Sequence, residues 1–345
     1  MSSLDSAPHP HFTSGQNWPF NKILTLIREA YPTLPCTLSA IIWGVLILWT
    51  NVVLVAIAVT PFKLSFTSAL PSIISIVGAL IGLSLRQRNW LKTGTAVEQN
   101  FLCMFACMLT LVSANMLGSL AFPYQDQALL AADKALFNFE WRGLTAFVVQ
   151  QPHILATCEF CYKILFQQPV IVIPFLVCAV SMQAAREFTL AWTLTLLAVV
   201  CIYPFFPAAG AFVTFDIQPG DLPIFRIATA WNELRIMEGV RNMTLLTFEP
   251  NDLAGIISFP SFHAAGAAVF AWSFSRIPVL KWIGIPLNII IIFAAIPIGA
   301  HYLVDVVAGI AVACLAIIAT KAVARLDIRN AVRPGLLAQP KPAVG

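Results

Sequence analysis

Residues 299–320 read GAHYLVDVVAGIAVACLAIIAT, an apolar stretch with one acidic residue, Asp305, and one histidine, His301. A helix needs about 20 such residues to cross the hydrocarbon core of a bilayer. An aspartate in a membrane helix is costly, which by default makes it a functional residue with a partner. His301 lies four residues earlier, on the same face of a helix, and is that partner. The stretch therefore predicts a membrane helix that carries chemistry at one end.

Apolar stretches of this kind recur along the chain. Of its 345 residues, 59% are hydrophobic and 10% are charged, whereas about 25% are charged in a soluble domain. Hydropathy predicts spans at 37–59, 64–84, 100–121, 168–184, 188–209, 259–275, 278–297 and 299–320. We expect an all-α, polytopic membrane helix bundle of about eight transmembrane helices.

The basic residues of the connecting segments predict the topology. With this set of spans, 13 of the 20 lysines and arginines fall on the side of the two termini and 7 on the other side. By the positive-inside rule the termini are cytoplasmic, and the loops 122–167 and 210–258 face outward from a plasma membrane or bacterial inner membrane. The amphipathic loop 122–167 should form short helices in the membrane interface.

These observations divide the chain into four parts. We predict a polar N-terminal tail at 1–36, two accessory transmembrane helices at 37–99, a membrane domain at 100–325 and a flexible C-terminal tail at 326–345. The net charge of +4 is mostly a topology signal, so no nucleic-acid partner is expected.

The cysteines give little functional signal. Six of the eight lie in or beside predicted spans, where cysteine is a small apolar side chain. Cys158 and Cys161 form a CxxC in the outward loop, which by itself is a weak indication of a disulfide or a metal half-site.

A second histidine is expected at the same membrane face as His301. His263 lies at the outer start of the span at 259–275, and that span and the one at 278–297 carry the chain inward and back to the same face, where His301 begins the last span. Asp305 can accept the proton of one His301 ring nitrogen and leave the other nitrogen free as a nucleophile or base. A structural hydrogen bond between helices is the alternative explanation of this pair.

Two residues before His263, Ser261 follows a proline that can start a helix. The free backbone N–H groups of that helix end could bind phosphate, with the Ser261 hydroxyl as a further donor. Taken alone, the Pro-Ser pair is an ordinary helix start. The histidine that follows gives it functional weight.

These residues resemble the type 2 phosphatidic acid phosphatase superfamily. Pro260, Ser261 and His263 match its Pro-Ser-x-His motif, and His301 and Asp305 match its His-x-x-x-Asp motif. The sequences FPSFHA and GAHYLVDVVAG are most similar to the branch that contains inositol phosphorylceramide synthases and their bacterial relatives. The resemblance is specific over about 225–315, and the span layout extends it to about residue 100 as a six-helix, phosphatase-like core.

The resemblance implies a metal-independent, two-step phosphoryl transfer on a lipid-linked phosphate, without a cofactor. His301 would attack phosphorus, Asp305 would stabilise the imidazolium, and protonated His263 would donate to the leaving alkoxide. Water, or a polyol acceptor such as inositol, would then release the phosphoryl group. The expected partners are a lipid phosphate substrate, membrane lipids and this acceptor.

Two positions depart from the family pattern. Ala295 stands where the third motif usually has an arginine, and the first motif, a lysine followed by Arg-Pro, is not present. Other cations must then meet the charge of the phosphoryl oxygens. The outward loop supplies Arg226, Arg235 and Arg241. Of these we favour Arg235 and Arg241 as phosphate-binding residues, in addition to Ser261.

The alternative function is a polytopic transporter of a lipid or a small anionic solute, since transporters also have many spans and few buried charges. In this chain the motif residues gather at one membrane face and not at mid-membrane, which favours an enzyme. A scaffold role would leave the two histidines and Asp305 unexplained.

Overall fold

Long helices dominate the structure, a computed structural model that describes residues 37–337, with side chains over 38–325. The predicted tail at 1–36 lies outside the described residues. Within them, six helical segments are long and apolar enough to cross a membrane. The six segments are α2 (Thr37–Val59), α3 (Phe66–Gln87), α4 (Leu91–Gly118), the segment Pro152–Val180, α9 (Met182–Ile202) and α14 (Leu303–Leu337). The protein is an all-α, polytopic integral membrane protein, as predicted.

Two of the eight predicted spans form helices that are too short to cross a membrane by the length criterion that the other six meet. The spans at 259–275 and 278–297 correspond to α12 (Phe262–Phe274) and α13 (Lys281–Ala294), which have 13 and 14 residues. At 1.5 Å per residue each is only about 20 Å long. The other residues of these two predicted spans are mostly apolar but lie in turns and loops outside the helices. Hydropathy alone does not distinguish an apolar loop from an apolar helix.

The predicted span at 168–184 begins earlier than expected. The helical segment starts with α7 (Pro152–Lys163) and continues through a 3-10 turn, η1 (Leu165–Gln167), into α8 (Gln168–Phe175) and a π-helical turn, η2 (Leu176–Val180). The preceding loop forms α5 (Asp126–Phe137) and α6 (Trp141–Val149), which confirms the prediction of short helices there. Their position at the membrane interface stays a prediction.

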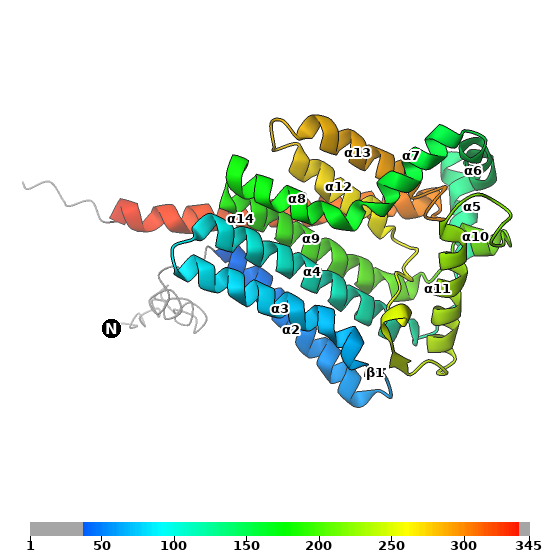
Figure 1. Cartoon of the computed structure of the whole chain (residues 1–345), viewed down its shortest axis with the longest axis horizontal. Coiled ribbons are helices and arrows are strands. Elements are labelled where there is room, and N and C mark those ends of the chain that lie inside the picture. The colour runs from blue at the N-terminus through cyan, green and yellow to red at the C-terminus, as the bar shows by residue number, and fades with distance from the viewer. Residues whose placement is uncertain (1–36, 338–345) are drawn as a thin grey trace, which may run out of the picture. The chain divides into compact units, whose positions relative to one another are not determined.

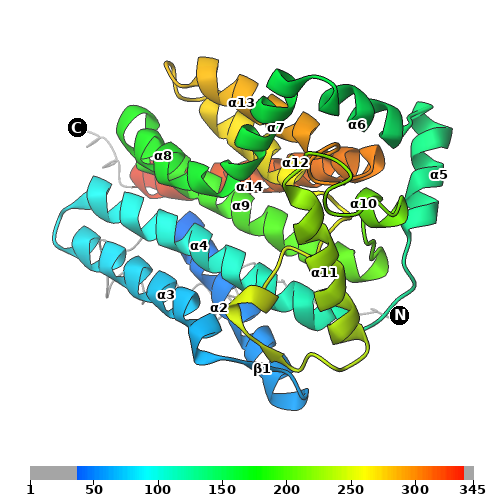
Figure 2. The same cartoon turned by 45° about the vertical axis from the view of Figure 1, so that its right-hand side comes forward.

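The long helices pack side by side. Figures 1 and 2 show α4 between α3 and α9. Glycine permits the close approach of α3 and α4, because a Cβ atom on Gly82 would lie 2.4 Å from the backbone nitrogen of Glu98. A short parallel pair, β1 (Lys63–Leu64) and β2 (Thr247–Phe248), joins the α2–α3 connection to the segment before α12.

Several short helices gather at one end of the bundle. There α5, α6, α10 (Ala211–Thr214) and α11 (Arg226–Arg241) lie beside the start of α14 (Figure 2). The 3-10 turns η3 (Tyr203–Phe205) and η4 (Pro250–Asp252) complete the connections. At its other end α14 continues to Leu337, so the first part of the predicted C-terminal tail at 326–345 is helical.

Candidate active site

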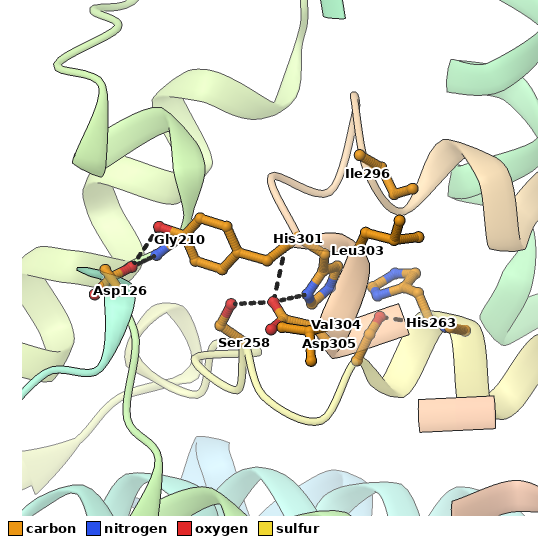
Figure 3. Close-up of polar contacts among 12 residues, drawn as sticks. Asp126, Gly210, Ser258, His263, Ile296, His301, Leu303, Val304 and Asp305 are labelled. Carbon is orange, nitrogen blue, oxygen red and sulfur yellow. Dashed lines mark hydrogen bonds and ion pairs between the residues drawn. The ribbon is translucent and has the colours of Figure 1, made fainter. Parts of the chain in front are cut away.

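His301 and Asp305 form a buried pair at the start of α14. His301 precedes the first helical residue, and Asp305 lies in the first turn. The distance from His301 Nδ1 to Asp305 Oδ2 is 3.5 Å, and the two side chains are 4% and 0% exposed. The backbone N–H of Tyr302 and the hydroxyl of Ser258 donate to the same oxygen, at 3.0 and 3.2 Å (Figure 3). The predicted contact forms, although His301 lies in the turn before the helix.

His263 lies close to this pair, in the first turn of α12. Its ring centroid is 6.3 Å from that of His301, which confirms the prediction that both histidines reach the same end of the bundle. Tyr162 of α7 stacks on His263 with ring centroids 4.0 Å apart, and the Tyr162 hydroxyl is 3.2 Å from His263 Nδ1. Because Nδ1 is occupied, Nε2 is the ring nitrogen available to a substrate.

Ser261 acts as the N-cap of α12. Its hydroxyl oxygen accepts from the Ala264 N–H at 3.3 Å, and its own N–H donates to the Asp305 carbonyl at 3.0 Å. A Cβ atom at Gly309 would lie 2.2 Å from the Ser261 carbonyl, so α14 can approach the α12 start only with glycine there. Ser261 is fully buried, and its phosphate-binding role stays a prediction.

The two histidines line one narrow polar pocket of about 40 Å³. Its other polar side chains include Tyr162, Arg226 and Glu233. The Arg226 guanidinium donates to both carboxylate oxygens of Glu233, each at 2.9 Å, and the two side chains are 16% and 15% exposed. Arg226 is thus the arginine that lies beside the histidines.

The two arginines favoured from the sequence lie elsewhere on α11. Arg235 is 64% exposed, donates to Asn232 and lies 3.8 Å from Asp252. Arg241 donates to the carbonyls of Phe122 and Ala121. Neither lines the histidine pocket, so their phosphate-binding role stays a prediction. Arg226 and Glu233 are seven residues apart, which places them on one helix face and is the sequence signal that would have favoured Arg226.

A larger, mostly apolar cavity of about 440 Å³ adjoins the polar pocket. Its apolar lining comes from α4, η1, α9 and α12, and includes Met108, Leu111, Phe166, Leu196 and Phe262. Tyr162, Arg226, Glu233 and His263 line both spaces. An amphipathic molecule can therefore place a polar group beside the histidines and an apolar chain in this cavity.

The helix α5 supports the site from outside the bundle. Asp133 accepts from the N–H groups of Leu303 and Val304, at 2.8 and 2.7 Å, and so caps the N-terminus of α14. Burial raises the pKa of the Asp133 carboxyl above its ordinary value, against the opposite effect of these two N–H groups. Asp126 accepts from the Gly210 N–H and the Tyr302 hydroxyl, each at 2.9 Å (Figure 3).

Neither aspartate stands out in the sequence as a site residue, because an amphipathic loop helix usually has a solvated acidic face. Their spacing of seven residues on one face of α5 is the signal that was available.

The described residues include no cluster of three or more histidine, cysteine or acidic side chains that could hold a metal ion. Cys158 and Cys161 are both buried free thiols, so the structure holds no disulfide at the CxxC.

The family comparison agrees with the geometry. Residues 127–319, more than half of the chain, match the family model of the PAP2 superfamily, and this segment contains both histidines and Asp305. No curated protein and no solved structure matches the chain.

Proposed function

The chain belongs to the PAP2 superfamily and is a membrane protein of phosphatase type, and from this premise we propose that it acts on a lipid-linked phosphate. The reaction is hydrolysis or transfer of the phosphoryl group through a phosphohistidine intermediate. The finer identity that we propose is the inositol phosphorylceramide synthase-like branch, in which an inositol phosphate or similar headgroup is transferred.

One observation carries the proposal. His263 and His301, the latter paired with the buried Asp305, line a single pocket that adjoins an apolar cavity. A nucleophile with an orienting carboxylate, and an acid at a second position, are the groups that a covalent phosphoryl transfer needs. The apolar cavity supports a substrate whose leaving group is a lipid.

In the first step His301 is the nucleophile. Asp305 Oδ2 lies 3.5 Å from His301 Nδ1, where it can accept the Nδ1 proton and so hold the ring in the tautomer with a free Nε2 lone pair. A bond forms between Nε2 and phosphorus, and the bond from phosphorus to the lipid oxygen breaks. His263 gives its Nε2 proton to the departing alkoxide.

In the second step water or an alcohol attacks the phosphohistidine. His263 now takes the proton of the attacking hydroxyl, and His301 leaves as the neutral imidazole. Water gives hydrolysis, and a polyol such as inositol gives transfer. Arg226 stabilises the negative charge on the phosphoryl oxygens. The same role for Ser261, Arg235 and Arg241 is proposed from the sequence alone.

We further propose that the pocket faces the non-cytoplasmic side of the membrane and that the termini are cytoplasmic. The excess of basic residues on the terminus side supports this orientation.

The testing experiment measures phosphate release and headgroup transfer from a panel of lipid phosphates, with and without myo-inositol, by the purified protein in detergent. We expect activity in the wild type and in the control H153A, whose histidine is exposed on α7 outside the histidine pocket. The variant H301A should be inactive. Equal activity in H301A contradicts the nucleophile, and substrate flux across sealed vesicles without phosphate release favours the transporter.

A further inference from the structure

We propose that Tyr162 is a positioning residue for His263, which fixes the tautomer of its imidazole and stabilises its protonated form. The proposal rests on the proposed function, because it assigns Tyr162 a role in the proton transfer of the same reaction. Tyr162 belongs to neither sequence motif. It lies on α7, 101 residues before His263 in the chain.

Tyr162 contacts His263 through both its ring and its hydroxyl. The two rings are nearly parallel, at an angle of 10° with centroids 4.0 Å apart, so the phenol ring covers one face of the imidazole. The hydroxyl oxygen is 3.2 Å from His263 Nδ1. Phe166 of η1 meets the same imidazole edge-on, with centroids 5.8 Å apart. These contacts leave the imidazole little freedom to turn.

The segment before His301 holds Tyr162 from another side. Tyr162 is 5% exposed. A Cβ atom on Gly299 would lie 3.0 Å from Tyr162 Cε2 and 2.9 Å from His301 Cδ2, so glycine at this position lets both rings lie close. Tyr162 therefore lies against the segments that carry both histidines, and its own position is set by packing.

The two steps of the reaction need one particular tautomer of His263. After His263 gives its Nε2 proton to the lipid alkoxide, the neutral ring must keep its other proton on Nδ1. Only then does Nε2 have the free lone pair that takes a proton from water or an alcohol in the second step. A phenol oxygen can accept a hydrogen bond from Nδ1–H, so Tyr162 favours this tautomer.

The phenol ring also favours the charged form of His263. The face of an aromatic ring attracts a cation within about 6 Å of its centroid, and the imidazole lies at 4.0 Å. This attraction is stronger where water is excluded, as it is around the buried Tyr162. The Arg226 guanidinium lies 5.9 Å from the same ring centroid and is held by Glu233, which limits its repulsion of a protonated His263.

The test compares leaving groups that do and do not need a proton. Phosphatidate and 4-nitrophenyl phosphate are one pair of probes, and phosphatidylmethanol and methyl 4-nitrophenyl phosphate are the matching pair for a diester reaction. Release of diacylglycerol or nitrophenolate is measured in mixed micelles with the purified protein. We compare kcat/KM, which reports the transition state of bond cleavage relative to the free protein and substrate.

Two variants separate the hydroxyl from the ring. Y162F keeps the stacked ring and should lower kcat/KM for the lipid probe by about tenfold. Y162L loses both contacts and should lower it by about 100-fold. Each variant should stay within about twofold of the wild type for the nitrophenyl probe, whose leaving group needs no proton. The double variant Y162F/H263A should be no less active than H263A, because Tyr162 acts through His263.

Y203F is the matched control. Tyr203 is also buried, but its hydroxyl contacts Met237 Sδ at 3.4 Å and it does not line the histidine pocket. Y203F should leave the ratio of the two probes unchanged. Because one preparation of each variant serves both probes, this ratio does not depend on the folded fraction. Wild-type activity of Y162F on the lipid probe, an equal loss on both probes, or a further loss in the double variant overturns the positioning role.

The variant H301A separates this proposal from the proposed function. If cleavage depends on His301 but Y162F does not distinguish the leaving groups, only the role of Tyr162 fails. If the wild type cleaves none of the four probes, or cleavage survives in H301A, the proposed function fails and the role of Tyr162 fails with it.

Discussion

The two ends of α12 and α14 bury charge in different ways. At the end where these helices begin, His263 and His301 line a pocket, and one carboxylate oxygen of Asp305, the partner of His301, has no hydrogen-bond partner. At the other end, Glu187 of α9 forms an ion pair with Arg276 at 2.8 Å and accepts from Lys321 at 3.1 Å.

The two ends differ in function: one has a pocket that a substrate can enter, and the other has ion pairs that hold helices together. Glu187 and its two cations bind α9, the end of α12 and α14 to one another, and a structural role explains the three charges. At the histidine end His263 and His301 instead line a space that a substrate can enter, and Asp305 contacts His301 at 3.5 Å. Rare charges in a membrane protein are therefore informative when they line a cavity.

The largest expected effect is on the nucleophile. H301A should lower kcat/KM for the best lipid substrate by about 10⁴-fold or more, since loss of a covalent nucleophile removes the whole covalent route. Thermal unfolding in detergent should change little in comparison. If the loss of activity in H301A only accompanied a comparable fall in Tm, His301 would have a structural role, as Glu187 has at the other end.

The second effect is on the acid. H263A should reduce kcat/KM by about 10²–10⁴-fold for substrates with an alkoxide leaving group. The loss should shrink for a nitrophenyl ester, because that leaving group needs no proton. An equal loss for both leaving groups would argue that His263 acts only by packing on Tyr162.

A smaller effect is expected at α5, which supports the pocket without lining it. D133A should cost about 1 kcal/mol of stability through loss of the α14 cap and lower kcat by about tenfold through displacement of His301. D133N keeps one acceptor and should restore part of kcat with KM unchanged.

The control for this prediction is E140A. Glu140 forms an exposed ion pair with Lys134 just after α5, and exposed pairs contribute little. If both variants lose the same activity, the α14 cap does not position His301.

The smallest effect on activity is expected at the opposite end. E187Q should lower the stability by about 1–3 kcal/mol, since Arg276 and Lys321 lose a charged acceptor, and should leave kcat within about twofold at 25 °C. Both are measured on the same detergent preparation. A loss of kcat as large as that of D133A would remove the distinction between the two ends.

The outcome for the arginines shows where spacing arguments fail. Arg235 and Arg241 lie in the predicted loop, but the loop folds as α11, and only one face of that helix meets the pocket. Arg226 and Glu233 share that face, whereas Arg235 is exposed and Arg241 contacts the α4–α5 connection.

The sequence by itself determined the fold class, the family, and the meeting of His263 with His301. Hydropathy fixes which segments enter a membrane because the cost of burying polar groups in lipid is large and local. The number of helix reversals then fixes which helix ends share a face.

Only the tertiary structure decided which residues complete the site. The pairing of Arg226 with Glu233, the caps from Asp126 and Asp133 and the apolar cavity all join segments far apart in the chain. Such contacts depend on helix rotation and loop path, which side-chain packing sets and which local pattern does not encode.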